Sequence, residues 1–317
     1  MIFVSIAAFC DPFLPHTLLD AVSKAKNPEL LVFAVVDQIQ ESRKNALAAL
    51  CEPAELRYVH ISPVESRGVC WARSIAYSLC QTEEHFLQID SHMLFESAWD
   101  EQLLQKWQDL KIASAKPLIS TYPYGFEFED HQPVVKIEVS DQTTLVLRPN
   151  PESALTESNA TLTFRAEHVF TQSDVLGAHL AGGFLFGSTD FINQVPYDPR
   201  LYFHGEEQSM ALRAYTHGWD IYHPHHIPLF HLYKTPNVSH DNHHWHPNWD
   251  AQREIKFTTF NSLSNQRVMD LVYQRRDLGS FGLGRERSLE DYSRFSGINY
   301  PGRQVISEYR EQGYVFE

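Results

Sequence analysis

The sequence is poor in cysteine, and the few that it has are scattered. Its four cysteines, Cys10, Cys51, Cys70 and Cys80, are too few for a disulfide scaffold. None of them forms a Cys-x-x-Cys pair that would bind a metal or carry redox chemistry. We therefore expect a reducing compartment, and a cytoplasmic location.

Long apolar segments are also missing. No window approaches the roughly 18 to 20 apolar residues that a membrane span requires. The first residues, MIFVSIAAFCDP, contain no basic segment, and their apolar run ends at Asp11. This pattern indicates a buried strand rather than a signal peptide, so we expect a soluble protein without a membrane span.

Positive charge is scarce as well. The chain has 26 Lys and Arg against 40 Asp and Glu, which gives a net charge of −14 with histidine neutral. Nucleic-acid affinity depends on Lys and Arg that neutralise phosphates, so this balance argues against a nucleic-acid partner. The chain could still bind a small anionic ligand, but only where local groups neutralise the charge of that ligand.

What the sequence does contain is an alternation typical of an α/β fold. Its 317 residues can bury one large core or two modest ones. Short apolar runs at Ile2–Phe9, Leu30–Val36, Leu56–Ile61 and His85–Ile89 are separated by segments with helical spacing. Such strands fit a parallel sheet that is covered on both faces, so residues 1–110 are predicted to form a Rossmann-like half.

After Lys116 the pattern favours antiparallel pairing. Val134–Val139 and Thr143–Leu147 alternate around Ser140–Gln142, which predicts a hairpin. Beyond His240 the sequence is aromatic and irregular up to a predicted helix over Asp250–Gln274.

No internal repeat or low-complexity tract divides the chain. We therefore predict one domain over 1–317, made of a nucleotide-binding half over 1–110 and an acceptor and catalytic half over 117–235. An aromatic and helical extension over 236–317 would wrap around them.

The first chemical motif is Asp90-Ser91-His92, directly after the apolar run that ends at Ile89. Ligands of open parallel sheets bind outside the carboxyl ends of strands. In an extended segment, Asp90 and His92 lie on the same side and can both reach one divalent ion, such as Mn²⁺ or Mg²⁺. The alternative is a polar turn in which Asp90 caps the next helix.

The second motif surrounds a predicted helix start at Val69. Gly68 permits close backbone approach, and Arg67 at the helix mouth could bind a phosphate together with the free amides there. Arg73 is predicted to lie off the buried stripe of this helix and to add a second positive charge. The alternative is a solvated face with ion pairs to Glu83 or Glu84.

Two further signals are weak when taken alone. Gly182 and Gly183 would let the backbone pass a sugar or phosphate closely, and Glu206 and Glu207 could orient hydroxyls or stabilise positive charge. The alternatives are a glycine bulge and an acidic first helical turn.

The histidines form the most unusual feature, because 8 of the 17 fall between His223 and His246. Their spacing fits no zinc signature, so most of them are expected to be surface or aromatic-packing residues. His231 differs because it ends an apolar run that could return it to the ligand edge of the sheet. There it would complete a site of three ligands with Asp90 and His92.

The order of these features resembles GT-A glycosyltransferases. More closely, the chain resembles the polypeptide N-acetylglucosaminyltransferase family that modifies hydroxyproline on a ubiquitin-ligase adaptor, and its bacterial relatives. The similar stretches are Ile2–Pro28, Ser66–Leu104, Ala181–Pro224 and Leu283–Ile298. The implied fold is a GT-A α/β fold with a mixed central sheet.

The resemblance also implies an activity: transfer of GlcNAc or a close sugar from a UDP-sugar to a hydroxyl of a protein or glycan, with retention at the anomeric carbon. Asp90, His92 and His231 would hold a divalent cation, Mn²⁺ or alternatively Mg²⁺. The residues implied to contact the nucleotide-sugar are Ser5 and Asp11 in a loop under the uridine, Arg67, Gly68, Arg73, Asp90, Gly182 and Gly183.

At the reacting centre, the resemblance places Glu206 and Glu207. Glu207 would stabilise positive charge on the sugar or act as a nucleophile, and Glu206 would bind sugar hydroxyls by hydrogen bonds.

Two other functions are compatible with the sequence. One is a metal hydrolase built on His243, His244 and His246. The other is a non-catalytic carbohydrate-binding module that uses the aromatic surface around Trp245 and Trp249, and it would bind sugar without metal.

Overall fold

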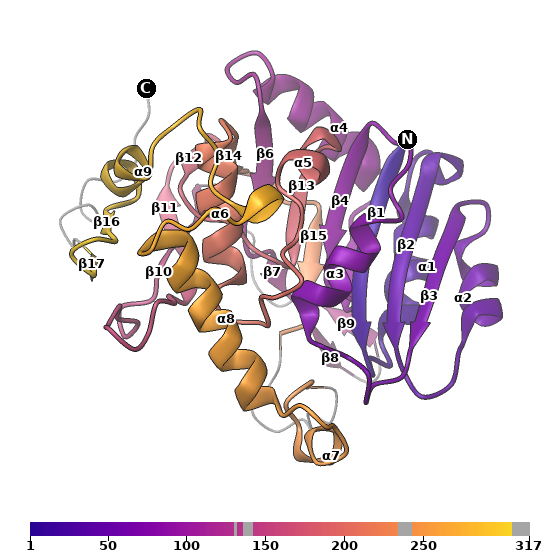
Figure 1. The fold of residues 1–317 in the computed structure, drawn as a ribbon. Coiled ribbons are helices and arrows are strands. Elements are labelled where there is room, and N and C mark those ends of the chain that lie inside the picture. The colour runs from indigo at the N-terminus through magenta and orange to yellow at the C-terminus, as the bar shows by residue number, and fades with distance from the viewer. Residues whose placement is uncertain (130–131, 136–141, 234–242, 306–317) are drawn as a thin grey trace.

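The centre of the molecule is an eight-stranded sheet with the order β12-β14-β6-β13-β4-β1-β2-β3 (Figure 1). The structure is a computed structural model, and it describes residues 1–129, 132–135, 142–233 and 243–305. The strands of the sheet are β1 (Ile2–Phe9), β2 (Leu31–Gln38), β3 (Glu55–Ile61), β4 (His85–Ile89), β6 (Pro117–Ser120), β12 (Val175–Gly177), β13 (Phe184–Ser188) and β14 (Asp220–His223).

The first half of the sheet is parallel, as the sequence predicted. β1 pairs in parallel with β2 and β4, and β2 pairs in parallel with β3. Every residue of β2 is buried, which explains its unbroken apolar run.

The second half is mixed. β13 runs antiparallel to its neighbours β4 and β6, whereas β14 is parallel to β6. Because β13 is reversed, its first residues lie at the edge where the parallel strands end.

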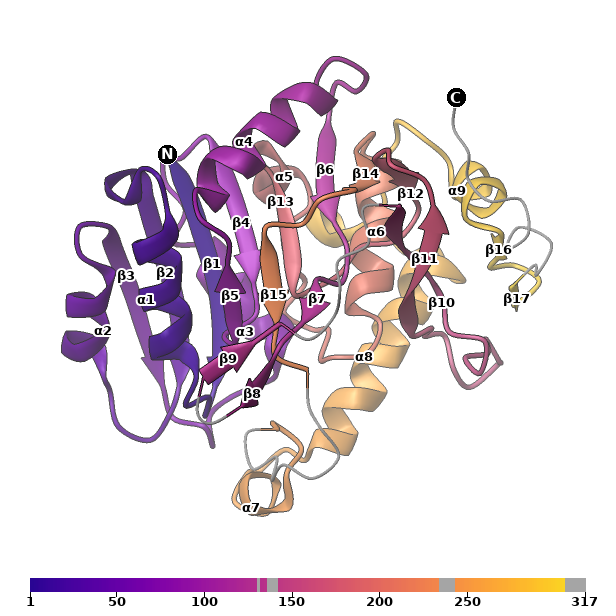
Figure 2. The same ribbon diagram turned by 180° about the vertical axis from the view of Figure 1, so that it is seen from behind.

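Helices cover both faces of the sheet (Figures 1 and 2). One face carries α1 (Leu14–Lys24), α2 (Lys44–Cys51) and α4 (Trp99–Leu110). The other carries α3 (Val69–Tyr77), α5 (Asp190–Gln194), α6 (Glu206–Thr216) and α8 (Phe257–Val272). Successive strand residues alternate between two apolar clusters: Phe3 joins the cluster under α6, and Val4 joins the one under α1.

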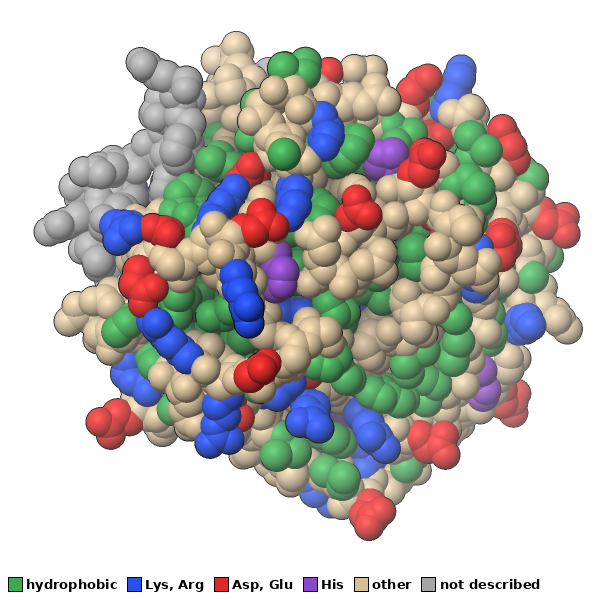
Figure 3. Space-filling view, turned by 45° about the horizontal axis from the view of Figure 1, so that its top comes forward, with side chains coloured by type: hydrophobic (Ala, Val, Ile, Leu, Met, Phe, Trp, Pro, Cys, Tyr) green, Lys and Arg blue, Asp and Glu red, His purple; other side chains and the backbone are tan. Residues whose placement is uncertain are grey.

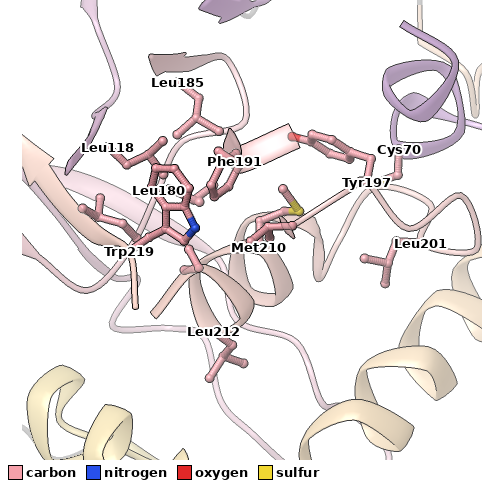
Figure 4. Close-up of a cluster of buried hydrophobic side chains, with 14 of the residues drawn as sticks. Cys70, Leu118, Leu180, Leu185, Phe191, Tyr197, Leu201, Met210, Leu212 and Trp219 are labelled. Carbon is pink, nitrogen blue, oxygen red and sulfur yellow. The ribbon is translucent and has the colours of Figure 1, made fainter. Parts of the chain in front are cut away.

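The cluster under α6 is the larger core (Figure 4). Met210 of α6 packs there with Phe191 and with the fully buried phenol ring of Tyr197. Trp219 meets Phe191 edge-on with ring centroids 5.2 Å apart. This core fixes the position of α6, whose first turn carries two glutamates.

Small sheets lie beside the central one (Figure 2). β5 (Met93–Phe95) pairs with β15 (Leu229–His231), which also pairs with β7 (Tyr124–Gly125). The remaining short elements are β8 (Glu127–Glu129), β9 (Gln132–Val134), β10 (Thr143–Pro149), β11 (Phe164–Phe170), α7 (Pro247–Asp250), α9 (Leu289–Ser296), β16 (Ile298–Asn299), β17 (Gln304–Val305) and the 3-10 turns Pro28–Leu30 and Gly279–Phe281.

Two local predictions need correction. The strand predicted over Thr143–Leu147 exists as β10, but its partner is β11. Most of the predicted partner, Val134–Val139, and of the turn lies outside the described residues. The helix predicted over Asp250–Gln274 begins at Phe257, and Asp250 instead ends the short helix α7 while its carboxylate accepts a hydrogen bond from the Phe257 N–H.

The surface carries charges of both signs (Figure 3). In the face shown in Figure 3, acidic side chains lie among the basic ones. Within the described ranges, no helix has both the length and the apolar character that crossing a bilayer would demand. All four cysteines are free thiols, as the scattered spacing predicted.

We predict that two buried histidines make folding sensitive to acid. Burial lowers the pKa of His223 to about 4 and that of His179 to about 3. Below about pH 6.5 the unfolded chain therefore binds more protons than the folded one, and the free energy of unfolding decreases as pH falls. For His223 alone, the loss by pH 4 is about 3 kcal/mol.

Urea unfolding between pH 7 and pH 4 checks this prediction. His223→Gln should reduce the slope of stability against pH, and the exposed His16→Gln should leave the slope of the wild type unchanged. Equal slopes in His223→Gln and the wild type would contradict it.

Candidate functional site

The site lies at the edge of the sheet where the parallel strands end, the lower edge in Figure 1. β1 and β4 run side by side, so Asp11 and Asp90, which follow them, come to the same edge. Gly182 and Gly183 precede the reversed strand β13 and arrive there from the second half of the chain.

A cavity of about 510 Å³ opens at this edge. Its walls combine residues from the first half of the chain with the loop before α6 and the histidine cluster. They are Ala7, Phe9, Asp11, Gln38, Gly68, Val69, Asp90, Ser91, His92, Tyr202, Phe203, His204, His231, Leu232, Tyr233, His243, His244 and Trp245.

Asp90, His92 and His231 converge in this cavity. One ligand atom from each lies within 4.8 Å of the others. The pairing of β15 with β5 sets His231 opposite Met93, next to His92, and the two imidazole rings are 4.8 Å apart. A carboxylate with two imidazoles suits Mn²⁺ and related divalent ions, so these residues fit a metal site.

Asp11 supports one of these histidines. Its Oδ2 lies 2.6 Å from Nδ1 of His92 and accepts a hydrogen bond of 2.5 Å from the Ser91 hydroxyl. Burial alone raises the pKa of Asp11, but the hydrogen bond and charge of His92 outweigh it and hold the pKa below its usual value. A carboxylate in such a contact fixes the orientation of an imidazole ring, as it does for many metal-binding histidines.

Arg73 is buried between two carboxylates. Its Nη2 donates to Asp90 Oδ1 at 2.7 Å, its Nη1 donates to Glu206, and 4% of its side chain is exposed. The prediction that Arg73 lies off the buried face of its helix is therefore wrong. The charge is tolerated there because both partners are ionisable acids.

Asp90 is held as an anion by these neighbours. Burial by itself raises the pKa of its carboxyl, but the hydrogen bond from His231 and the positive charge of Arg73 lower it well below the usual value. His231 Nε2 lies 3.1 Å from Asp90 Oδ2.

The paired glycines make room for these charges. A Cβ atom on Gly182 would lie 2.6 Å from Nη1 of Arg73, and one on Gly183 would lie 2.5 Å from Oδ2 of Asp90. The sequence predicted a close approach of this backbone to a sugar or phosphate, which stays a prediction. The groups that the structure places close to these glycines are charged side chains of the protein itself.

The two glutamates differ in their surroundings. Glu206 is buried against Arg73 and accepts a hydrogen bond of 2.8 Å from Tyr197. Glu207 accepts one from the Tyr122 hydroxyl at 2.6 Å and one from the Gly182 N–H at 2.9 Å. Burial outweighs both hydrogen bonds and raises the pKa of Glu207 to about 7.

The remaining predicted residues lie in different places. Gly68 lines the cavity at the start of α3, while Arg67 is exposed beside Trp71. Ser5 was expected in a loop, but it is fully buried in the middle of β1, because the strand continues to Phe9. Ala7, two residues later on the same face, reaches the cavity instead.

Sequence reasoning missed several residues of the site. Tyr122 follows β6, so its position after a strand was the signal that could have indicated it. His244 is buried and packs against aromatic rings, one of the roles expected of the clustered histidines, with its ring centroid 5.3 Å from that of Phe9 and 5.2 Å from that of Tyr202. Sequence reasoning missed its polar contacts: Nδ1 lies 2.7 Å from the Tyr202 hydroxyl and Nε2 lies 2.9 Å from the Ser66 carbonyl. His240 lies outside the described residues.

Comparisons with known proteins bear on the fold and the family of the chain. No curated protein matches the chain. The crystal structure of GalNAc-T7 with UDP, GalNAc and Mn²⁺ is similar over 98% of this chain, with a TM-score of 0.60 and 12% identity. The alignment covers 54% of the GalNAc-T7 chain, so this chain spans about half the length of that structure.

A weaker similarity is to S. aureus TarS 1–349, with a TM-score of 0.45 and 10% identity over 73% of this chain and 60% of that one. The family model for glycosyltransferase (GlcNAc) matches residues 1–56 and 46–301. The α/β GT-A fold predicted from the sequence is confirmed, and the chain belongs to the glycosyltransferase (GlcNAc) family.

Proposed function

We propose that this chain is a metal-dependent glycosyltransferase that moves GlcNAc or a close sugar from a UDP-sugar to a hydroxyl of a protein or glycan. The observation that carries the proposal is the convergence of Asp90, His92 and His231 in a cavity of about 510 Å³ at the ligand edge of the sheet. The GalNAc-T7 structure, which contains UDP and Mn²⁺, supports the choice of donor and ion, with Mg²⁺ as the alternative.

Asp90, His92 and His231 would hold the divalent ion. When bound, such an ion supplies Lewis-acid stabilisation for the negative charge that develops on the leaving diphosphate. Asp11 orients the His92 ring, and Arg73 keeps Asp90 ionised and in place.

Under this proposal, the start of α3 would bind the nucleotide. Gly68 lines the cavity there, and the exposed Arg67 beside it would bind a phosphate or a uracil edge. Arg73 already pairs with two carboxylates, so its role is to position them rather than to bind phosphate.

For retention, the acceptor hydroxyl attacks the anomeric carbon on the face that the diphosphate leaves. The bond from that carbon to the phosphate oxygen breaks, the new glycosidic bond forms, and the hydroxyl proton passes to the departing phosphate. Ionised Glu207 would stabilise positive charge on the sugar ring or form a transient covalent adduct. Glu206, held by Arg73 and Tyr197, is better placed to position Arg73 than to grip sugar hydroxyls.

The hydrolase alternative is less well supported. In the part of the chain that the structure describes, the one group of ligands close enough to share a metal ion is Asp90, His92 and His231. Both ring nitrogens of His244 face protein partners, Tyr202 and Ser66.

The first prediction concerns activity. Purified protein with Mn²⁺ should release UDP from at least one UDP-sugar, and Asp90→Asn or His231→Ala should lower that rate by about 10²-fold, the typical loss for one strong electrostatic contact. Arg294→Ala, at an exposed residue paired with Asp291, serves as the control with a mild effect.

A coupled UDP assay over a panel of UDP-sugars, with calorimetry of UDP binding, measures this. The proposal fails if no UDP-sugar is turned over and none binds. A larger loss in Arg294→Ala than in Asp90→Asn would mean that the ligand set is wrong.

The second prediction concerns Asp11. Asp11→Asn should weaken Mn²⁺ binding by about 10-fold to 100-fold, because the amide no longer fixes the His92 ring as a carboxylate does. Calorimetric titration with Mn²⁺ alone gives this affinity, and Asp109→Asn on the exposed side of α4 is the matched control. Unchanged Mn²⁺ affinity in a folded Asp11→Asn protein would refute the supporting role.

The third prediction concerns the ionisation of Glu207. Its ionised form increases as pH rises through about 7, so kcat/KM of the wild type should rise through the same range. Glu207→Gln should lose this limb and about 10²-fold in rate. The same limb in the pH profile of Glu207→Gln would assign the titration to another group.

A further inference from the structure

A second cavity, of about 330 Å³, adjoins the first, and His204 belongs to the walls of both. Two segments that are far apart in the sequence form the rest of it. They are the loop between β10 and β11, with Ser158, Asn159 and Thr161, and helix α8, with Asn261, Ser262 and Asn265.

The chemistry of this cavity is uniform. Among the residues that the structure describes, its lining consists of hydroxyls, side-chain amides and one imidazole, without a Lys, Arg, Asp or Glu. In a chain with a net charge of −14, walls without a carboxylate favour a neutral ligand. Hydroxyls and amides both donate and accept hydrogen bonds, as the hydroxyl groups of a sugar do.

Protein contacts hold the walls in place. Asn265 accepts a hydrogen bond from the Ala160 N–H at 2.9 Å and donates one to the Ser158 carbonyl at 3.0 Å, which ties α8 to the loop. Ser264 donates to the His204 carbonyl at 2.9 Å. Within the described ranges, the side chains of Asn261 and Ser262 make no hydrogen bond to protein, so their polar groups are available to a ligand.

An aromatic ridge borders the shared wall. Phe203 is 44% exposed, and its ring lies 5.2 Å from that of His204 and 5.0 Å from that of Trp245. Apolar ring faces beside hydroxyls and amides match the two kinds of surface that a sugar ring presents.

The second cavity is also close in the chain to the proposed reacting centre. His204 is followed by Gly205 and then by Glu206 and Glu207 of α6. A Cβ atom on Gly205 would lie 3.1 Å from Thr161 in the cavity wall. A ligand in the second cavity would therefore lie close to the first turn of α6.

We propose that this second cavity binds the uncharged oligosaccharide part of the acceptor. The inference rests on the proposed function and deepens it, because it makes the acceptor a neutral glycan rather than a bare peptide. Binding of the glycan at this subsite uses hydrogen bonds and ring contacts only, and it needs neither the donor nor a metal.

The test is an array of neutral oligosaccharides and unglycosylated peptides, probed with the full chain in the presence of a chelator. The wild type should bind neutral glycans. Ser262→Trp, which adds a bulky side chain to the cavity wall, should weaken that binding by on the order of 10-fold or more. Leu263→Trp is the control on the same helix, since Leu263 is 57% exposed and lies outside the cavity wall.

UDP binding with Mn²⁺, measured by calorimetry, separates the two proposals. It should be equal in the wild type and both variants, and its absence from all three would overturn the proposed function itself. With UDP binding intact, the inference about the second cavity is overturned if the wild type binds no neutral glycan, binds only peptides, or binds glycans as tightly after Ser262→Trp.

Discussion

The arrangement of the site depends on one buried guanidinium. Arg73 joins Asp90, at the end of β4, to Glu206, at the start of α6, and so connects the sheet to a helix that covers it. Removing one member of such a buried network leaves an uncompensated charge and costs about 3 to 5 kcal/mol. Gly182 and Gly183 allow the approach, since a side chain at either position would collide with these charged groups.

Side chains of the apolar core also hold the polar groups of the site in place. Tyr197 packs in the cluster under α6 while its hydroxyl donates to Glu206, and Gln88 of β4 donates both to that hydroxyl and to the Gly182 carbonyl. The polar groups of the site are therefore anchored by side chains that cannot move without disturbing the core. Preorganisation of this kind lets fixed charges act on a transition state without first having to reorient.

The geometry of the site bears on how a chain with a net negative charge could bind a negatively charged donor. Because Arg73 is already neutralised by carboxylates, it offers little to a diphosphate, and under the proposed function that charge falls to a bound cation and to Arg67. The two cavities then differ in charge: the first is lined by Asp11 and Asp90, whereas the described residues that line the second are uncharged. The division of the chain into halves at 1–110 and 117–235 stays a prediction.

The sequence by itself determined the elements that hydrophobic periodicity encodes. β1 and β4 begin and end where the pattern predicts, and the order of strands placed Asp90 and His92 at the ligand edge. Only the tertiary structure decided which polar groups meet there. The contacts of Asp11 with His92 and of Tyr122 with Glu207 join residues 81 and 85 positions apart. Periodicity reports whether a face is buried, but it carries no information about the distant partner that makes a buried charge such as Arg73 tolerable.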